Sequence, residues 1–259
     1  MTYEIVPATE ALLVEVEGWL DAEEAAHQTG EAAYVANGYE GDVPPRGFRV
    51  NWDTTKGRWR EGGGIDILLV DGDAVGFQGH GIFEIRPDLR RKGYGRILAE
   101  FMIARAYDEG WSVFEIGIAP WTAEPFWQSM GFTIVPDRPD RGAGTFAYRI
   151  LSRSFTLSGG ERIPFLIGFF TRDERYEDEP RPFATFSGLG ERVADGTIQL
   201  PERAYCFNPL EETSLNDFVR VEVDGEELHF EKLKRDSSAA IGLECDGAYT
   251  YFMDKIRPT

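Results

Sequence analysis

Cysteine is scarce in this 259-residue sequence, where only Cys206 and Cys245 occur. Two cysteines cannot build a disulfide framework, and their separation does not match the paired spacing of a zinc site. We therefore predict no metal centre. The sequence also lacks a long uncharged apolar run, and its N-terminus lacks a basic segment followed by an apolar one. These absences predict a cytoplasmic protein with no membrane partner.

Positive charge is also in short supply. Lysine and arginine number 27 against 45 aspartate and glutamate residues, so the formal net charge is −18. Such an acidic chain repels nucleic acids and anionic membranes, and we expect neither as a partner. Cationic partners, such as amines, are favoured. General solubility, or an organism with an acidic proteome, explains the charge without any partner, and we prefer that explanation.

The most informative stretch is FEIRPDLRRKGYGRIL, from Phe83 to Leu98. Phe83 and Ile85 have the spacing of a buried strand, which Pro87 ends. A helical apolar face follows the two glycines of the turn, and Gly110 is placed to cap that helix. Backbone N–H groups at a helix N-terminus favour a phosphate-bearing ligand. The cations around this turn are Arg90, Arg91, Lys92 and Arg96.

This string resembles the acetyl-CoA signature of the GNAT superfamily of N-acyltransferases, R/Q-x-x-G-x-G/A after a strand ending V-x-P. Arg90, Gly93 and Gly95 fill the signature. A second stretch, AEPFWQSMGF, resembles the family's A-x-x-x-Y-x-x-x-G-F helix, with Trp127 where tyrosine is usual. The resemblance covers roughly residues 1–150. It implies an α/β (α+β) fold with a mixed sheet and helices on both faces.

The resemblance also implies where acetyl-CoA binds. The turn would grip the pyrophosphate, and the pantetheine arm would pair with the strand near Ile85, wedged against the strand Val113–Ile118. The residues assigned in this way to the co-substrate are Ile85, Arg86, Arg90, Arg91, Lys92, Gly93, Tyr94, Gly95, Arg96 and Trp127. An indole donates a hydrogen bond but is not a useful acid, so Trp127 cannot replace the family's tyrosine as a proton donor.

Transfer to an amine needs a base, because an alkylammonium group has a pKa of roughly 10.4. Glu115 is our first candidate, since its spacing to Trp127 matches the glutamate-to-tyrosine spacing of the ribosomal-protein alanine acetyltransferases of this superfamily. Glu84 is the second, because it alternates away from Phe83 and Ile85 toward the opposite face of the sheet. His80, between two glycines, is the third candidate.

Around the signature we expect helices to alternate with strands. A strand at residues 3–6 precedes a helix capped by Thr9, and Asp71-Gly72 makes a two-residue hairpin turn. The other expected elements are a second helical stretch at 31–36, a strand Val113–Ile118 parallel to residues 83–85, a helix capped by Thr122 and ended by Gly131, and strands at 132–135 and 144–150. Residues 39–64 read as a loop.

That loop allows two interpretations. In GNAT enzymes the corresponding region walls the acceptor site. Acidic Glu40 and Asp42, with aromatic Tyr39, Phe48 and Trp52, would suit a cationic acceptor with an apolar body. An ordinary mobile loop explains the composition equally well.

Beyond residue 150 helical patterns disappear, so we predict two domains, a GNAT-like domain at 1–152 and a mostly β domain at 153–259. Two hairpins are expected, with turns at Asp224-Gly225 and Asp246-Gly247. The first should pair Val221 with Leu228 and Glu222 with Glu227. Residues 172–182 should form an exposed loop.

Taken together, these patterns predict an N-acyltransferase that moves an acetyl group from acetyl-CoA to a primary amine of a small molecule or peptide, by direct attack in a ternary complex. Two alternatives stay open. The protein could be an acyl-CoA-binding sensor or scaffold without efficient turnover, or the β domain could bind a partner. The acceptor is not identified by the sequence, and a homodimer is left open.

Overall fold

The computed structural model describes residues 2–43, 46–79, 81–139, 144–212, 216–233 and 239–258. His80, one of the three candidate bases, lies outside these residues. By packing, the chain divides into two compact units, Met1–Met102 and Ile103–Thr259.

The first unit is built on a four-stranded antiparallel sheet with strand order β1-β2-β3-β4. Its strands are β1 (Tyr3–Pro7), β2 (Asp66–Val70), β3 (Asp73–Gly79) and β4 (Ile82–Ile85). Asp71 and Gly72, with φ angles of 50° and 95°, form the predicted turn between β2 and β3. β4 is an edge strand of this sheet, so its outer backbone edge pairs with no strand among the described residues.

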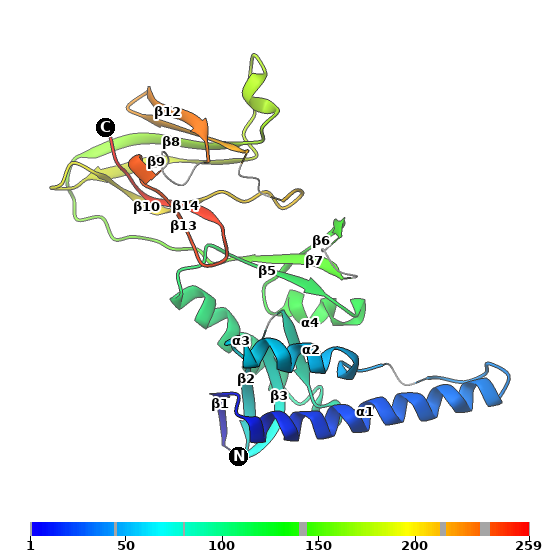
Figure 1. The fold of residues 1–259 in the computed structure, drawn as a ribbon. Coiled ribbons are helices and arrows are strands. Elements are labelled where there is room, and N and C mark those ends of the chain that lie inside the picture. Colours follow the sequence, from blue (N-terminus) through cyan, green and yellow to red (C-terminus); the bar gives the residue numbers. More distant parts are fainter. Residues whose placement is uncertain are drawn as a thin grey trace. The chain divides into compact units, whose positions relative to one another are not determined.

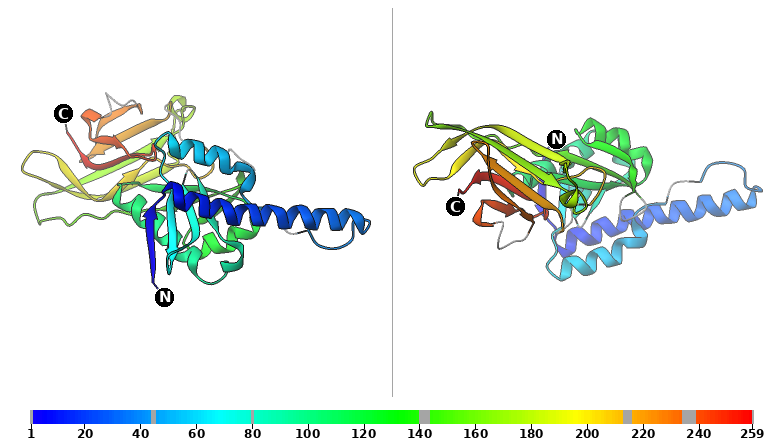
Figure 2. Two further views of the ribbon diagram at one scale, coloured as in Figure 1. Left: turned by 60° about the horizontal axis from the view of Figure 1, so that its bottom comes forward. Right: turned by 90° about the horizontal axis from the view of Figure 1, so that it is seen from above.

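Helices cover both faces of this sheet, as predicted. α1 (Glu10–Ala36) and α2 (Arg49–Arg60) pack on one face, and the start of α3 (Tyr94–Asp108) packs on the other (Figure 1). Thr9 caps α1 by accepting a 3.3 Å hydrogen bond from the amide of Leu12. The buried residues of α1 all lie in its first half, and Figure 2 shows the second half extending beyond the strands of its sheet.

Two predictions for this unit were wrong. The helical stretch at 31–36 is not separate, because α1 runs unbroken to Ala36. The loop predicted for 39–64 contains α2. Trp52 and Thr55 lie three residues apart on one helical face and are buried, and Arg49 forms an ion pair of 3.3 Å with Asp53 one turn later. Glycines and prolines on either side of α2 concealed this short helical pattern.

The second unit begins with a three-stranded sheet of order β5-β7-β6. Its elements are β5 (Val113–Ile118), the short α4 (Glu124–Ser129), β6 (Thr133–Pro139) and β7 (Thr145–Ile150). All ladders among the described residues are antiparallel: β4 pairs with β3, and β5 pairs with β7. The parallel ladder predicted between the strands at 83–85 and 113–118 is therefore not formed.

The ends of α4 confirm one prediction and correct another. Gly131, with a φ angle of 83°, follows the helix as its left-handed C-terminal residue, as predicted. Thr122 is not the N-cap. It lies inside a 3₁₀ turn, Trp121–Ala123, and Ala123 caps α4 without a side-chain hydrogen bond.

A seven-stranded antiparallel sheet of order β12-β11-β8-β9-β10-β14-β13 makes up the rest of this unit. The strands are β8 (Arg162–Phe170), β9 (Ala184–Arg192), β10 (Ile198–Tyr205), β11 (Phe218–Val223), β12 (Glu226–Lys232), β13 (Leu243–Cys245) and β14 (Tyr251–Ile256). The mostly β character predicted after residue 150 is confirmed. Between β8 and β9 lies the predicted loop, which carries a 3₁₀ turn at Glu174–Tyr176.

Both predicted hairpins are present, but their registers differ from the prediction. In the first, Glu222 faces Glu227 as expected, whereas Val221 faces His229 instead of Leu228 because the ladder is bulged there. In the second, the loop spans five residues, and Cys245 pairs with Tyr251. The carboxylate of Asp246 orders this loop by accepting hydrogen bonds from two of its amides.

The predicted boundary near residue 152 falls inside the second unit. Val113 and Phe146 of the three-stranded sheet share one buried cluster with Phe207, which follows β10. The Tyr148 and Phe207 ring centroids are 4.8 Å apart. Residues before and after 152 therefore share a core, and the division into domains at that point stays a prediction.

Candidate functional site

The turn between β4 and α3 has the backbone shape that its sequence suggests. A 3₁₀ turn at Pro87–Leu89 follows β4, and α3 begins at Tyr94. Arg91 and Gly93 have φ angles of 62° and 93°, so two left-handed residues lie in the turn. A non-glycine residue in that region is uncommon and often marks a ligand-binding loop. Nothing lies within 4 Å of the position that a Cβ on Gly93 would take, so the main chain there is open to a ligand.

Five of the residues assigned to the co-substrate fall into two groups. Ile85 and Tyr94 are buried in the core between the sheet and α3, so their side chains support the turn from below. The side chains of Arg91, Lys92 and Arg96 are exposed around the turn. This second group leaves cationic side chains beside the first amides of α3, which is the combination that binds phosphate. Arg86 is paired with Asp88 at 2.9 Å.

The signature arginine is bound to carboxylates. Arg90 Nε donates to the carbonyl oxygen of Ile85 at 2.9 Å, which holds the guanidinium at the end of β4. Its Nη2 lies 3.0 Å from Glu23 Oε1 and 3.3 Å from Glu84 Oε2. The guanidinium of Arg90, which was predicted to belong to the co-substrate site, is therefore shared between two acidic side chains.

Glu84 lies on the face of the sheet that α1 and α2 cover, as its alternation from Phe83 and Ile85 predicts. It faces Phe77 across the β3–β4 ladder, and directly opposed residues share a face. Phe77 is fully buried and packs against the rings of Trp19, Phe48 and Trp52. Glu84 is thus a carboxylate beside an aromatic core.

Burial raises the pKa of Glu84 from its ordinary value to about 7. Arg90 opposes this shift, because a cation favours the carboxylate form, and the negative charge of Glu23 adds to the rise in pKa. Desolvation outweighs the attraction of the single shared guanidinium. A carboxyl group that titrates near neutrality can accept a proton at physiological pH.

Glu23 was not identified by the sequence reasoning. It lies one turn after Trp19 on α1, on the stripe that packs toward the sheet, and this position was the available signal. Its side chain is 9% exposed. Glu23 Oε2 is buried and has no hydrogen-bond partner among the described residues. The backbone of Gly47 lies against this carboxylate so closely that a Cβ on Gly47 would overlap Oε2.

Two other candidate residues, Glu115 and Trp127, lie in the second unit. Glu115, the first candidate for the base, is exposed on β5 and faces Tyr148 of β7. Trp127 is buried on α4, where its ring lies edge-on to Phe126 and Phe132 at centroid distances of 5.1 and 5.2 Å. The roles assigned to Glu115 and Trp127 stay predictions.

The residues proposed to wall an acceptor site have two different environments. Trp52 is a core residue of the first unit and Phe48 is half-buried against the same cluster, so these rings shape the face on which Glu84 lies. Tyr39, Glu40 and Asp42 are exposed. The role of these residues in holding an acceptor stays a prediction.

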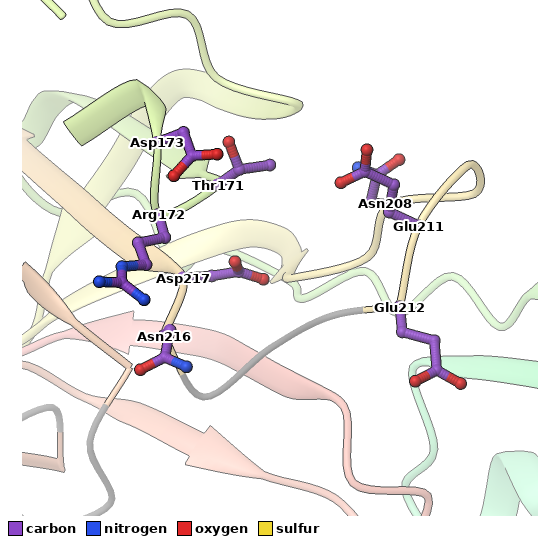
Figure 3. Close-up of a pocket in the computed structure, with 8 residues that line it drawn as sticks. All are labelled: Thr171, Arg172, Asp173, Asn208, Glu211, Glu212, Asn216 and Asp217. Atoms are coloured by element: carbon purple, nitrogen blue, oxygen red, sulfur yellow. The ribbon is translucent and has the colours of Figure 1, made fainter. Parts of the chain in front are cut away.

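A separate cavity of about 240 Å³ lies at one end of the seven-stranded sheet (Figure 3). Its lining residues are mostly acidic or polar: Thr171, Arg172, Asp173, Asn208, Glu211, Glu212, Asn216 and Asp217. Within the ranges that the structure describes, no three or more His, Cys, Asp or Glu side chains are placed to hold a metal ion. No helix in those ranges is both long and apolar enough to cross a membrane.

Comparison with known proteins gives no family model and no curated protein that matches. Many solved structures that resemble the chain are GNAT-family acetyltransferases. A GNAT acetyltransferase from Staphylococcus aureus Mu50 is 14% identical, with 58% of this chain and 99% of that one covered and a TM-score of 0.39. The PaiA N-acetyltransferase from Thermoplasma acidophilum, solved with coenzyme A, is 12% identical, with the same coverages and a TM-score of 0.40.

The ribosomal-protein-S18-alanine N-acetyltransferase from Escherichia coli is 16% identical. The similarity covers 62% of this chain and 99% of that one, with a TM-score of 0.37. The N-terminal part of the chain resembles GNAT acetyltransferases. Identities and TM-scores this low carry no argument about activity, which has to come from the site itself.

Proposed function

We propose that this protein is an N-acyltransferase that transfers an acyl group from an acyl-CoA, acetyl-CoA by preference, to a primary amine. The observation that carries the proposal is Glu84. It is a carboxyl group beside an aromatic core, close to the turn that precedes α3, and its pKa is about 7. A base tuned to neutrality beside a turn suited to phosphate is the combination that acyl transfer from a thioester requires.

The residues present fit an acyl-CoA. The cations Arg91, Lys92 and Arg96, with the open backbone at Gly93, would hold its phosphates. The outer edge of β4, which pairs with no other strand among the described residues, would pair with the extended pantetheine arm as an added strand. The bound thioester supplies an electrophilic carbonyl carbon and a sulfur leaving group.

Glu84 would supply the proton transfer. Its carboxylate takes a proton from the ammonium group of the acceptor, which frees the nitrogen lone pair to attack the carbonyl carbon. The C–N bond forms, the C–S bond breaks, and the sulfur leaves with the bonding electrons. The leaving thiolate takes the remaining surplus proton from the nitrogen, so the products are an amide and free CoA. A thiol pKa of roughly 8.5 makes this departure possible without an acid at Trp127.

Acetyl-CoA should stabilise the purified protein. At 100 times its dissociation constant it should add about 2.7 kcal/mol to the free energy of unfolding. We expect the variant Arg91→Glu/Arg96→Glu to lose most of this gain, because two cations beside the phosphates become anions. Thermal unfolding with and without acetyl-CoA measures both effects.

The matched control is Arg58→Glu/Arg60→Glu, which makes the same charge change at two exposed positions of α2. It should keep the stabilisation. If millimolar acetyl-CoA and longer acyl-CoAs all leave the melting temperature of the wild type unchanged, the turn does not bind acyl-CoA and the proposal is wrong.

The rate should depend on pH in the direction set by Glu84. Because its pKa is raised to about 7, the carboxylate that accepts the proton is the majority form only above that pH. We therefore expect kcat/KM for the acceptor to rise about tenfold per pH unit below 7 and to level off above it. Initial rates from pH 5 to 9 check this. A profile that is already flat at pH 5.5 would mean that Glu84 is not the base.

One observation favours the second candidate function, an acyl-CoA sensor without turnover. Trp127 is packed between aromatic rings at the place where the resemblance expects a tyrosine acid. A turnover screen with polyamines, aminoglycosides, amino acids and peptide N-termini separates the two functions. Tight acetyl-CoA binding without CoA release for any amine would favour the sensor.

A further inference from the structure

The first unit contains a network of three charged groups drawn from three elements that are distant in sequence. Glu23 comes from α1, Glu84 from β4 and Arg90 from the turn before α3. A single guanidinium nitrogen, Arg90 Nη2, contacts both carboxylates, at 3.0 Å for Glu23 and 3.3 Å for Glu84. Two anions thus compete for one cation, and the shorter contact belongs to Glu23.

The position of Glu23 is unfavourable by itself. Its side chain is more than nine-tenths buried, and only one of its oxygens has a partner. Leaving a buried charged oxygen without a donor destabilises a fold. The missing side chain of Gly47 leaves room for the Glu23 carboxylate at this position. A residue held at a cost to stability is a candidate for a functional role.

We propose that Glu23 is a positioning residue for the base: it draws Arg90 away from Glu84 and so keeps Glu84 able to accept a proton. This rests on the proposed function. Without the negative charge of Glu23, the guanidinium would pair with Glu84 alone. A carboxylate paired with its own arginine is a weaker base, because the ion pair favours the charged form.

The charged groups around Glu84 can be named from each element that packs against it within the described residues. α1 contributes Glu23, the turn contributes Arg90, and β3 contributes the uncharged Phe77 directly opposite. The effect of Glu23 on Glu84 therefore has two parts with the same sign. The negative charge of Glu23 raises the pKa of Glu84 directly, and the ion pair between Glu23 and Arg90 weakens the attraction of Arg90 for Glu84.

The test is the pH profile of Glu23→Gln, which keeps the shape of the side chain and removes its charge. The pH below which kcat/KM declines, which we call the acid limb, should be about one unit lower than in wild type. The plateau value of kcat/KM above pH 8 should fall about threefold to tenfold, because a weaker base transfers the proton less well. The KM for acetyl-CoA should stay within twofold of wild type. Glu31→Gln, at an exposed position on the same helix, removes an equal charge and should keep the wild-type profile.

A second variant reaches the network without changing any charge. In Gly47→Ala the new methyl group would overlap Oε2 of Glu23, so the carboxylate has to leave its present position, and we expect its contact with Arg90 to weaken. The acid limb should move in the same direction as in Glu23→Gln. If Glu23 only supported the fold, both variants would lower kcat/KM by the same factor at every pH, in proportion to the fraction of protein that is unfolded. The pH at which kcat/KM begins to fall would then stay the same as in wild type. An unmoved limb in folded Glu23→Gln protein overturns the proposal.

A direct titration separates this proposal from the proposed function. In protein carrying ¹³C-labelled glutamate, the Glu84 carboxyl signal, assigned with Glu84→Gln, reports its protonation without any substrate. The signal should titrate about one pH unit lower in Glu23→Gln than in wild type. If the wild type shows no turnover but this shift is present, the proposed reaction fails and the network stands. If the titration of Glu84 is the same in both proteins, the positioning role is wrong whatever the activity.

Discussion

Glu84→Gln should keep acetyl-CoA binding and lose turnover by roughly 10²–10⁴, which is the contribution expected from a general base. The amide of glutamine has nearly the same shape and can still contact Arg90, but it cannot accept the proton of the ammonium group. Steady-state kinetics with the best amine of the acceptor screen gives kcat. The melting-temperature shift with acetyl-CoA reports binding separately.

Stability distinguishes a lost base from a damaged fold. Because the folded-state pKa of Glu84 is raised, the folded protein holds a proton that the unfolded chain releases between about pH 4.5 and 7. Ionised Glu84 therefore lowers stability as pH rises through this window. We expect Glu84→Gln to melt no lower than wild type at pH 8. A marked loss of stability there would show that Glu84 supports the fold, and the kinetic result would then not identify a base.

Glu115 supplies the competing outcome. If Glu115→Gln loses the activity and Glu84→Gln keeps it, the base is the residue that the spacing to Trp127 suggests. Glu31→Gln, which removes an equal charge from an exposed position on α1, should behave as wild type. If Glu84→Gln and Glu115→Gln both keep the wild-type activity, the proton is removed by solvent, and the role proposed for Glu84 is wrong.

Arg203→Met should destabilise the second unit by about 3–5 kcal/mol, which is the usual loss when one partner of a buried ion pair is removed. Arg203, on β10, is 7% exposed and binds both oxygens of Asp254 on β14, at 2.8 and 2.7 Å. Its Nη1 also donates to the carbonyl oxygen of Gly110 at 2.5 Å. Methionine fills the space but leaves the Asp254 carboxylate and the Gly110 carbonyl without their donor.

Urea or thermal unfolding measures this effect, which corresponds to a fall in melting temperature of roughly 6–20 °C for a chain of this size. The control is Arg192→Met, since Arg192 is 42% exposed and pairs with Glu161 at 2.9 Å. An exposed pair contributes at most about 1 kcal/mol. Equal losses in the two variants would contradict the structural role assigned to Arg203. The double variant Arg203→Met/Asp254→Leu should recover part of the loss, because it removes the unpaired charge.

The sequence predicts local features of this fold well. Thr9, Asp71-Gly72 and Gly131 act through neighbouring backbone, so their chemistry can be read from a few residues. The alternation of side chains along β4 likewise predicts that Glu84 lies on the face of the sheet opposite to α3. The register of the β11–β12 hairpin could not be predicted, because the bulge after Val221 depends on packing rather than on the turn.

The carboxylate network lies beyond what the sequence shows. Sixty-seven positions separate Glu23 from Arg90, and only the packing of α1 on the sheet brings them within 3.0 Å. The motif resemblance places Arg90 among the residues that bind the co-substrate. The motif includes the turn but not α1, so it gives no sign of the contact between Arg90 and Glu23. The wrong prediction of a loop where α2 lies has the same cause. The contacts of Trp52 with Phe77 and with the core under α1 join residues that are distant in sequence.

The bonds around residues 110–112 bear on whether the chain can be divided after β7. Arg203 donates to the carbonyl oxygen of Gly110, and Asp246 Oδ2 accepts a hydrogen bond from the amide of Ser112 at 2.8 Å. Both partners lie beyond residue 200, so a chain cut after β7 would lose them and leave two polar backbone groups to be satisfied by water. The residues after β7 therefore do not form a detachable module, because they complete the hydrogen bonding of the part that precedes them.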